Sequence, residues 1–212
     1  MGGTTMTAEP ISEAAAEPVS EPTPRWWPRP PVDGWTVDDL HTLPGLPPHT
    51  EMIDGSLVFV TPQRAFHNLM IRLLTNGLLA GVPPELAVFN EMTVVIDRKN
   101  GPEPDVLVVR EEAFEGLRQT SFDVADVLLA VEVVSPESEA RDRNTKPRKY
   151  AAAGIKHFWL VEMEGKDDHP IVRVYELDPV THEYTWSGTH RDRLKVRAPY
   201  DIDIDLTALH KR

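Results

Sequence analysis

The sequence predicts a mixed α/β fold in which one β-sheet carries helices on its faces. Residues 127–134 form a continuous apolar run, which is typical of a central strand covered on both sides. Residues 65–79 place apolar side chains at helical spacing, and short apolar runs between turn residues follow without an internal repeat. The order of helix, strands, helix and further strands therefore indicates a mixed sheet with helices packed on it.

Cap and turn residues justify the individual elements. Thr36, followed three residues later by Asp39, marks a helix start, and the pair Asp54-Gly55 marks a two-residue β-hairpin turn. Gly154 is a typical residue for the end of a helix. In chain order we predict a helix over 37–42, a hairpin of 51–53 and 57–60, a helix over 65–79, strands 87–89, 92–96 and 105–109, the central strand 127–134, a helix over 143–153, a strand over 158–162, an additional C-terminal hairpin of 172–177 and 183–187, and an extended segment near 194–204.

Residues 1–31 are expected to be a disordered tail rich in Pro, Ala and Glu. They contain seven of the twenty prolines, and such a segment cannot bury enough apolar surface to offset its ordering entropy. Trp26 and Trp27 within it are either a docking element or a pair that packs on the domain edge or stays mobile. Residues 32–212 are long enough for one domain with a sizeable core.

Composition excludes several classes of protein. The chain has no cysteine, so disulfides, thiolate zinc sites and a cysteine nucleophile are excluded. No apolar run approaches the roughly 18 residues of a membrane span, and no secretion signal is visible, so we expect a cytoplasmic protein without a membrane partner. The net charge of −12 argues against a protein that coats nucleic acid, although an enzyme with clustered acidic metal ligands is compatible with it.

Two acidic residues on neighbouring predicted strands are the strongest candidates for chemistry. Asp105 follows a proline at the head of one strand, and Glu132 interrupts the apolar run of the next. A buried Glu is normally paired or bound to a cation, so the pair suggests a divalent metal site. The alternatives are a Pro-Asp turn for Asp105 and a structural salt bridge to an arginine for Glu132.

Basic residues follow directly after the second strand. Lys146 lies near the predicted helix start, where it can fold back toward the sheet, and Tyr150 shares its helix face. The other basic side chains are candidates for contacts with nucleic-acid phosphates: Arg141, Arg143, Arg148 and Lys149. The alternative is a solvated helix face.

Two further residues are candidates for the same site. Glu51, in the first hairpin, could complete a set of oxygen ligands for Mg²⁺, and by itself it is an ordinary strand residue. His67, on the long helix, could act as a general base or could be a packed or solvent-facing histidine. No metalloprotease, serine-hydrolase, Walker or Rossmann motif is present in the sequence.

The chain resembles the Uma2 family of restriction-type endonucleases, within the PD-(D/E)XK nuclease superfamily. The resemblance covers roughly residues 35–205 and consists of segments in the family's order: 51–58, the helix with His67, 104–106, 132–136, Asp142 with Lys146 and Tyr150, and 154–161. It implies a restriction-endonuclease-like fold, metal-dependent phosphodiester hydrolysis, and Asp105 and Glu132 as the main metal ligands. The superfamily's usual lysine position holds Val134, so the family pattern implies an ammonium from the following helix: Lys146, with Lys149 as its competitor.

Together, these residues predict an endonuclease that depends on Mg²⁺ or Mn²⁺ and acts on nucleic acid, with DNA as the expected substrate. Asp105 and Glu132, with Glu51, would hold the metal, and Lys146 would stabilise the charge that develops on the phosphate. Two alternatives stay open: an inactive nuclease-fold binding module, and an interaction protein that acts through its N-terminal tail. Strands of the C-terminal hairpin could also pair across a homodimer.

Overall fold

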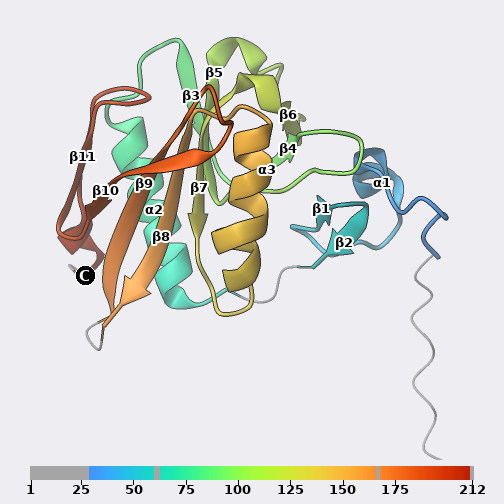
Figure 1. The fold of residues 1–212 in the computed structure, drawn as a ribbon, viewed down its shortest axis with the longest axis horizontal. Coiled ribbons are helices and arrows are strands. Elements are labelled where there is room, and N and C mark those ends of the chain that lie inside the picture. The colour runs from blue at the N-terminus through green and yellow to red at the C-terminus, as the bar shows by residue number, and fades with distance from the viewer. Residues whose placement is uncertain (1–28, 60–62, 166–167, 211–212) are drawn as a thin grey trace, which may run out of the picture.

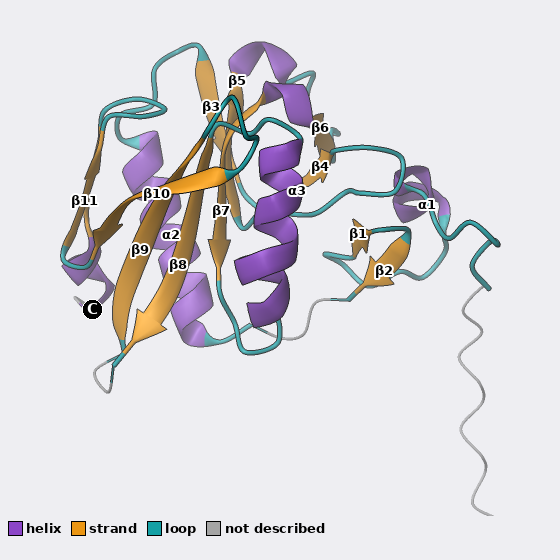
Figure 2. Cartoon of the chain, in the orientation of Figure 1, coloured by secondary structure: helices purple, strands orange, loops and turns teal. Residues whose placement is uncertain are grey.

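A six-stranded sheet forms the centre of the computed structural model, which describes residues 29–59, 63–165 and 168–210 (Figures 1 and 2). The strand order is β10-β9-β8-β7-β5-β3, and only β7 and β8 run parallel. The strands are β3 (Leu86–Phe89), β5 (Val106–Arg110), β7 (Val127–Val133), β8 (His157–Glu164), β9 (His169–Leu177) and β10 (Tyr184–His190). The prediction for the tail concerns mainly residues 1–28, which lie outside the described residues.

Alternating side chains on the strands bury both faces of this sheet. On β5, Val106 and Val108 belong to one apolar cluster with α2 (Ala65–Leu79), whereas Leu107 and Val109 belong to a second cluster on the opposite face. This second cluster contains Tyr150 of α3 (Lys146–Ala152). The two helices therefore cover opposite faces, as the continuous apolar run predicted (Figure 1).

The N-terminal elements form a separate small layer beside the sheet. The helix α1 (Val37–Thr42) begins where the backbone N–H and hydroxyl of Thr36 donate to the Asp39 carboxylate, at 2.7 and 2.8 Å. The strands β1 (Glu51–Ile53) and β2 (Ser56–Val58) pair around the Asp54-Gly55 turn, in which both residues have positive φ. The predicted helix and hairpin are confirmed here.

Strand pairing outside the central sheet differs from the expectation. β4 (Thr93–Val95) pairs in parallel with β6 (Ser121–Asp123), a short strand that the sequence analysis missed. The hairpin predicted near residues 172–187 is the β9–β10 end of the central sheet, and the additional hairpin is formed by β11 (Arg193–Val196) and β12 (Ile202–Asp205), where only an extended segment was expected. Short 3₁₀ turns occur at η1 (Glu111–Ala113), η2 (Val124–Asp126) and η4 (Leu206–His210).

The helix after the central strand begins differently from the prediction. A π-helical turn, η3 (Arg141–Thr145), precedes α3, and the helical path begins at Glu139, four residues earlier than the expected residue 143. Gly154 follows the helix at φ 91°, as expected for a C-terminal glycine. Single π turns are often found at functional sites, and this one leads directly to Lys146. Within the described ranges, no helix is both long and apolar enough to cross a membrane.

Candidate active site

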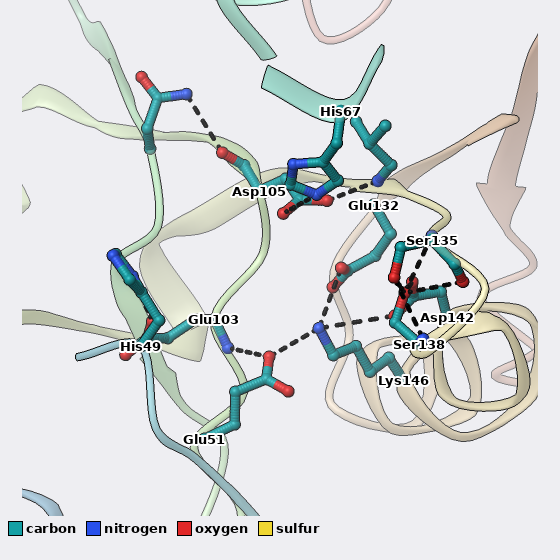
Figure 3. Close-up of polar contacts among 12 residues, drawn as sticks. His49, Glu51, His67, Glu103, Asp105, Glu132, Ser135, Ser138, Asp142 and Lys146 are labelled. Carbon is teal, nitrogen blue, oxygen red and sulfur yellow. Dashed lines mark hydrogen bonds and ion pairs between the residues drawn. The ribbon is translucent and has the colours of Figure 1, made fainter. Parts of the chain in front are cut away.

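A pocket of about 140 Å³ brings together acidic residues from distant parts of the chain. β1, the segment before β5, the end of β7 and η3 contribute the carboxylates described below, and α2 contributes His67 (Figure 3). The polar residues that matter below are Glu51, His67, Glu103, Asp105, Glu132, Ser135, Ser138, Arg141, Asp142 and Lys146. Six candidate residues from the sequence analysis thus line one pocket: Glu51, His67, Asp105, Glu132, Arg141 and Lys146.

The ammonium of Lys146 lies at the centre of this group. Its Nζ atom is 2.6 Å from Glu51 Oε1 and 3.0 Å from Glu132 Oε2, and it is 3.7 Å from Asp142 Oδ1. All four side chains are almost completely buried. Burial alone would lower the pKa of Lys146, but the surrounding carboxylates outweigh burial and hold that pKa well above its usual value. Lys146 therefore remains a fixed cation in the pocket.

The alternation of side chains on β7 explains why the lysine comes from the helix. Side chains alternate along the strand, so Glu132 lies on the same face of the sheet as Ala130 and Val134, which face α3. Val131 and Val133 face α2. Val134 packs against the apolar cluster that includes Tyr150. An ammonium from α3 can therefore reach Glu132 on the face of the sheet that Val134 shares.

A tyrosine from the same helix completes the contacts of Glu132. The Tyr150 hydroxyl donates to Glu132 Oε1 at 2.6 Å, and both groups are buried. Burial and the nearby Glu132 charge raise the pKa of Tyr150 well above its usual value, so the hydroxyl keeps its proton. Burial also raises the pKa of Glu132, although Lys146 acts in the opposite direction.

Replacing Tyr150 with phenylalanine is expected to lower the free energy of unfolding by about 1–3 kcal/mol, because a buried hydrogen bond to a charged group is lost. Urea unfolding measures this change. Tyr184→Phe is the matched control, because the Tyr184 hydroxyl donates to the neutral carbonyl of Ile155 at 2.8 Å in the same apolar cluster. If Tyr150→Phe loses less free energy of unfolding than Tyr184→Phe, the hydrogen bond from Tyr150 to Glu132 is not the stronger of the two.

Asp105 is held in place by its neighbours on both sides. Its Oδ2 accepts the backbone N–H of Val133 at 2.6 Å, and its Oδ1 lies 3.0 Å from His67 Nε2. Burial would lower the pKa of His67, but the hydrogen bond and charge of Asp105 outweigh it and raise that pKa. The structure thus places His67 in the pocket and against a carboxylate, rather than on a solvent-facing helix surface.

Glu51 is accompanied by two residues that the sequence analysis did not identify. Its Oε1 also accepts the backbone N–H of Glu103 at 2.9 Å, and His49 Nδ1 lies 3.3 Å from Glu103 Oε2. Burial and the Glu51 charge raise the pKa of Glu103. Glu103 stands two residues before Asp105, and both lie in the segment that leads into β5, so this closeness to Asp105 was the signal that could have found Glu103.

Asp142 is a further buried carboxylate of the pocket, which the sequence analysis named only in the family resemblance. The Ser138 hydroxyl donates to its Oδ2 atom and lies 3.0 Å from the hydroxyl of Ser135. Burial raises the pKa of Asp142 to about 6, and the attraction of Lys146 only partly opposes this. The pocket therefore holds more negative charge than its single lysine neutralises.

The raised pKa of Asp142 makes a prediction about stability and pH. Between about pH 4 and 6 the folded protein binds this proton more tightly than the unfolded chain, so stability falls as pH rises through that window. Asp142→Asn is expected to be more stable than the wild type at pH 7.5, by on the order of 2 kcal/mol. Urea unfolding at pH 7.5 and pH 4 measures the difference, which should shrink at the lower pH. If the stability difference between Asp142→Asn and the wild type does not change with pH, it does not come from the raised pKa of Asp142.

The remaining basic candidates are divided among different surfaces. Arg141 lines the acidic pocket, whereas Arg143 pairs with Glu162 and with Glu139. Arg148 lines a neighbouring groove beside the β9–β10 hairpin. Lys149 Nζ lies 2.5 Å from Asp54 Oδ1, away from the buried carboxylates, so the geometry favours Lys146 over its competitor.

The donor atoms of the pocket fit a hard divalent cation in their chemistry. Carboxylate oxygens are the preferred ligands of Mg²⁺ and Mn²⁺, and one buried oxygen, Asp142 Oδ1, has no hydrogen-bond partner. In the described residues, however, no three acidic or histidine side chains are already arranged as a ligand set. Lys146 lies between the carboxylates instead, so ligation would require side-chain rotations (Figure 3).

Comparisons with known proteins agree with this fold. The crystal structure of a "putative nuclease belonging to DUF820" from Anabaena variabilis superposes with a TM-score of 0.62 at 16% identity, over 83% of this chain and 97% of the other. This likeness confirms the predicted fold class. No curated protein matches the chain. The family model of Uma2, described as "Putative restriction endonuclease", matches residues 37–207, most of the 212 residues. The chain belongs to the Uma2 family.

Proposed function

We propose that this protein is a metal-dependent endonuclease that hydrolyses phosphodiester bonds, with DNA as its substrate. The observation that carries the proposal is the buried ammonium of Lys146, held between Glu51 and Glu132 in a pocket that also contains Asp105. Burying this many charged groups lowers the stability of the fold, and a catalytic site that uses the charges explains why the chain carries them. The family is described as a restriction endonuclease and the similar structure is named as a nuclease, and both descriptions support phosphodiester hydrolysis.

Asp105 and Glu132, with Glu51, would hold Mg²⁺ or Mn²⁺, because all three supply carboxylate oxygens to one pocket. The bound metal would supply an activated water and would polarise the scissile phosphate. Lys146 would stabilise negative charge on the phosphate, since its own position is fixed by two carboxylates before substrate arrives.

His67 and Arg141 have supporting roles in this proposal. His67 would hold a proton beside Asp105, because its Nε2 atom lies 3.0 Å from Asp105 Oδ1. Arg141 would bind a phosphate at the pocket, while Arg143, Arg148 and Lys149 would contact the strand further away. These arginines and lysines would supply local positive charge in a chain whose net charge is −12.

Incubation of supercoiled plasmid and of labelled single-stranded DNA with the purified full chain tests the proposal. Cleavage is expected with Mg²⁺ or Mn²⁺ and should be absent in EDTA. Asp105→Ala and Glu132→Ala are expected to abolish it, so cleavage at the wild-type rate by both variants would refute the assignment. RNA of the same sequence serves as the comparison that tests the choice of DNA.

An inactive binding module on the same fold is the second candidate. It is favoured by one observation: within the described ranges no three acidic or histidine side chains form a ready ligand set, and Lys146 already pairs with two of the carboxylates. This candidate predicts that the wild type binds DNA without cleaving it in either metal. Gel-shift and cleavage assays on the same samples separate the two functions.

A further inference from the structure

An unpartnered oxygen distinguishes Asp142 from the other acids of the pocket. Among the described residues, only three buried side-chain atoms lack a hydrogen-bond partner: Asp142 Oδ1, Arg141 Nε and Trp159 Nε1. The first two belong to adjacent residues that line the acidic pocket. Two of the three unsatisfied atoms thus occur at one place in the fold.

Both oxygens of Glu132 and both oxygens of Asp105 are already engaged. Glu132 accepts from Tyr150 through Oε1 and from Lys146 through Oε2. Asp105 contacts Val133 through Oδ2 and His67 through Oδ1. A cation bound by these oxygens would compete with protein donors that are present in the structure.

Asp142 differs because one of its oxygens, Oδ1, is buried and accepts no hydrogen bond. Ser138 donates its hydroxyl to Oδ2, which fixes the orientation of the carboxylate. Oδ1 lies 3.7 Å from Lys146 Nζ, which is too far for a hydrogen bond. The side chain is 2% exposed, so this oxygen is not solvated as it would be on the surface. An ionised carboxylate with a buried oxygen that accepts no hydrogen bond lowers the stability of the fold, unless a cation binds that oxygen.

We propose that Asp142 is a ligand of the divalent cation, with Oδ1 as the ligating oxygen and Ser138 as the residue that orients it. This inference rests on the proposed function and adds a ligand to the acids on β1, on the segment before β5 and on β7. The π turn η3 would then contribute directly to the metal site, because it carries Asp142 one turn before Lys146. Arg141 precedes Asp142 in the chain and lines the same pocket, so its cationic side chain would bind a phosphate at the metal site.

Calorimetric titration with Mn²⁺ alone, without DNA, tests this role. We compare the wild type, Asp142→Asn and the control Asp54→Asn, whose carboxylate pairs with Lys149 and is exposed. Asp142→Asn is expected to weaken Mn²⁺ binding at least about tenfold, because a neutral amide replaces an anionic ligand. Asp54→Asn should bind as the wild type does. Ser138→Ala is expected to weaken binding by a smaller factor.

Three outcomes overturn parts of the argument separately. Equal Mn²⁺ affinity for the wild type and Asp142→Asn would refute the ligand role of Asp142 and leave the proposed endonuclease untouched. Absence of Mn²⁺ binding by the wild type, with DNA cleavage that EDTA does not inhibit, would refute metal dependence itself. A loss of cleavage by Asp142→Asn at unchanged Mn²⁺ affinity would show that Asp142 positions Lys146 instead. Circular dichroism of each variant confirms that it is folded.

Discussion

Replacing Glu132 with glutamine is expected to lower the rate of DNA cleavage by about a thousandfold, which corresponds to roughly 4 kcal/mol of transition-state stabilisation. Glutamine keeps the shape of the side chain, and its single carbonyl oxygen can still accept a hydrogen bond from Lys146 or from Tyr150, which donate to the two oxygens of Glu132. It removes the negative charge that a divalent cation requires. The loss should therefore appear in the rate and in metal affinity, while the fold is retained.

Single-turnover cleavage of a labelled DNA fragment, measured over a range of Mg²⁺ concentrations, checks this result. Glu164→Gln is the matched control, because Glu164 lies on β8, the strand parallel to β7, but is half-exposed and pairs with Arg191. It should cleave at the wild-type rate. If Glu132→Gln cleaves within a few-fold of the wild type, Glu132 is not a metal ligand and its buried charge serves the fold alone.

Replacing Lys146 with methionine is expected to destabilise the protein by about 3–5 kcal/mol, because Glu51, Glu132 and Asp142 lose the cation between them while they remain buried. Methionine keeps most of the volume of the lysine side chain, so packing contributes little to the change. The loss should be smaller at pH 5 than at pH 8, because the stranded carboxyls can then take up protons.

Guanidinium chloride unfolding of Lys146→Met and Lys149→Met measures this difference. Lys149 is one turn of helix away and pairs with Asp54, which is 69% exposed, so its removal should cost no more than about 1 kcal/mol. Equal stability of the two variants would contradict the view that Lys146 neutralises the buried acids. The same samples should show whether the loss of Lys146 also abolishes DNA cleavage.

Local sequence patterns were sufficient for much of the fold. The helix over residues 65–79 was predicted from its apolar spacing and has those bounds in α2. The Asp54-Gly55 pair predicted the first hairpin because this turn needs two residues with positive φ. The short strand β6 was missed, since three residues are too few for an alternating pattern and its pairing with β4 is non-local.

The sequence by itself determined that Glu132 is a buried acid in an apolar strand and that a lysine follows it at the start of a helix. It could not identify Glu103 as a neighbour of Glu51 and His49, since more than fifty residues separate Glu103 from each of them along the chain. Only the tertiary structure decided that Lys146, and not Lys149, reaches the carboxylates. The reason is that helix rotation, fixed by the packing of Tyr150 against the sheet, decides which residue of the helix faces Glu132.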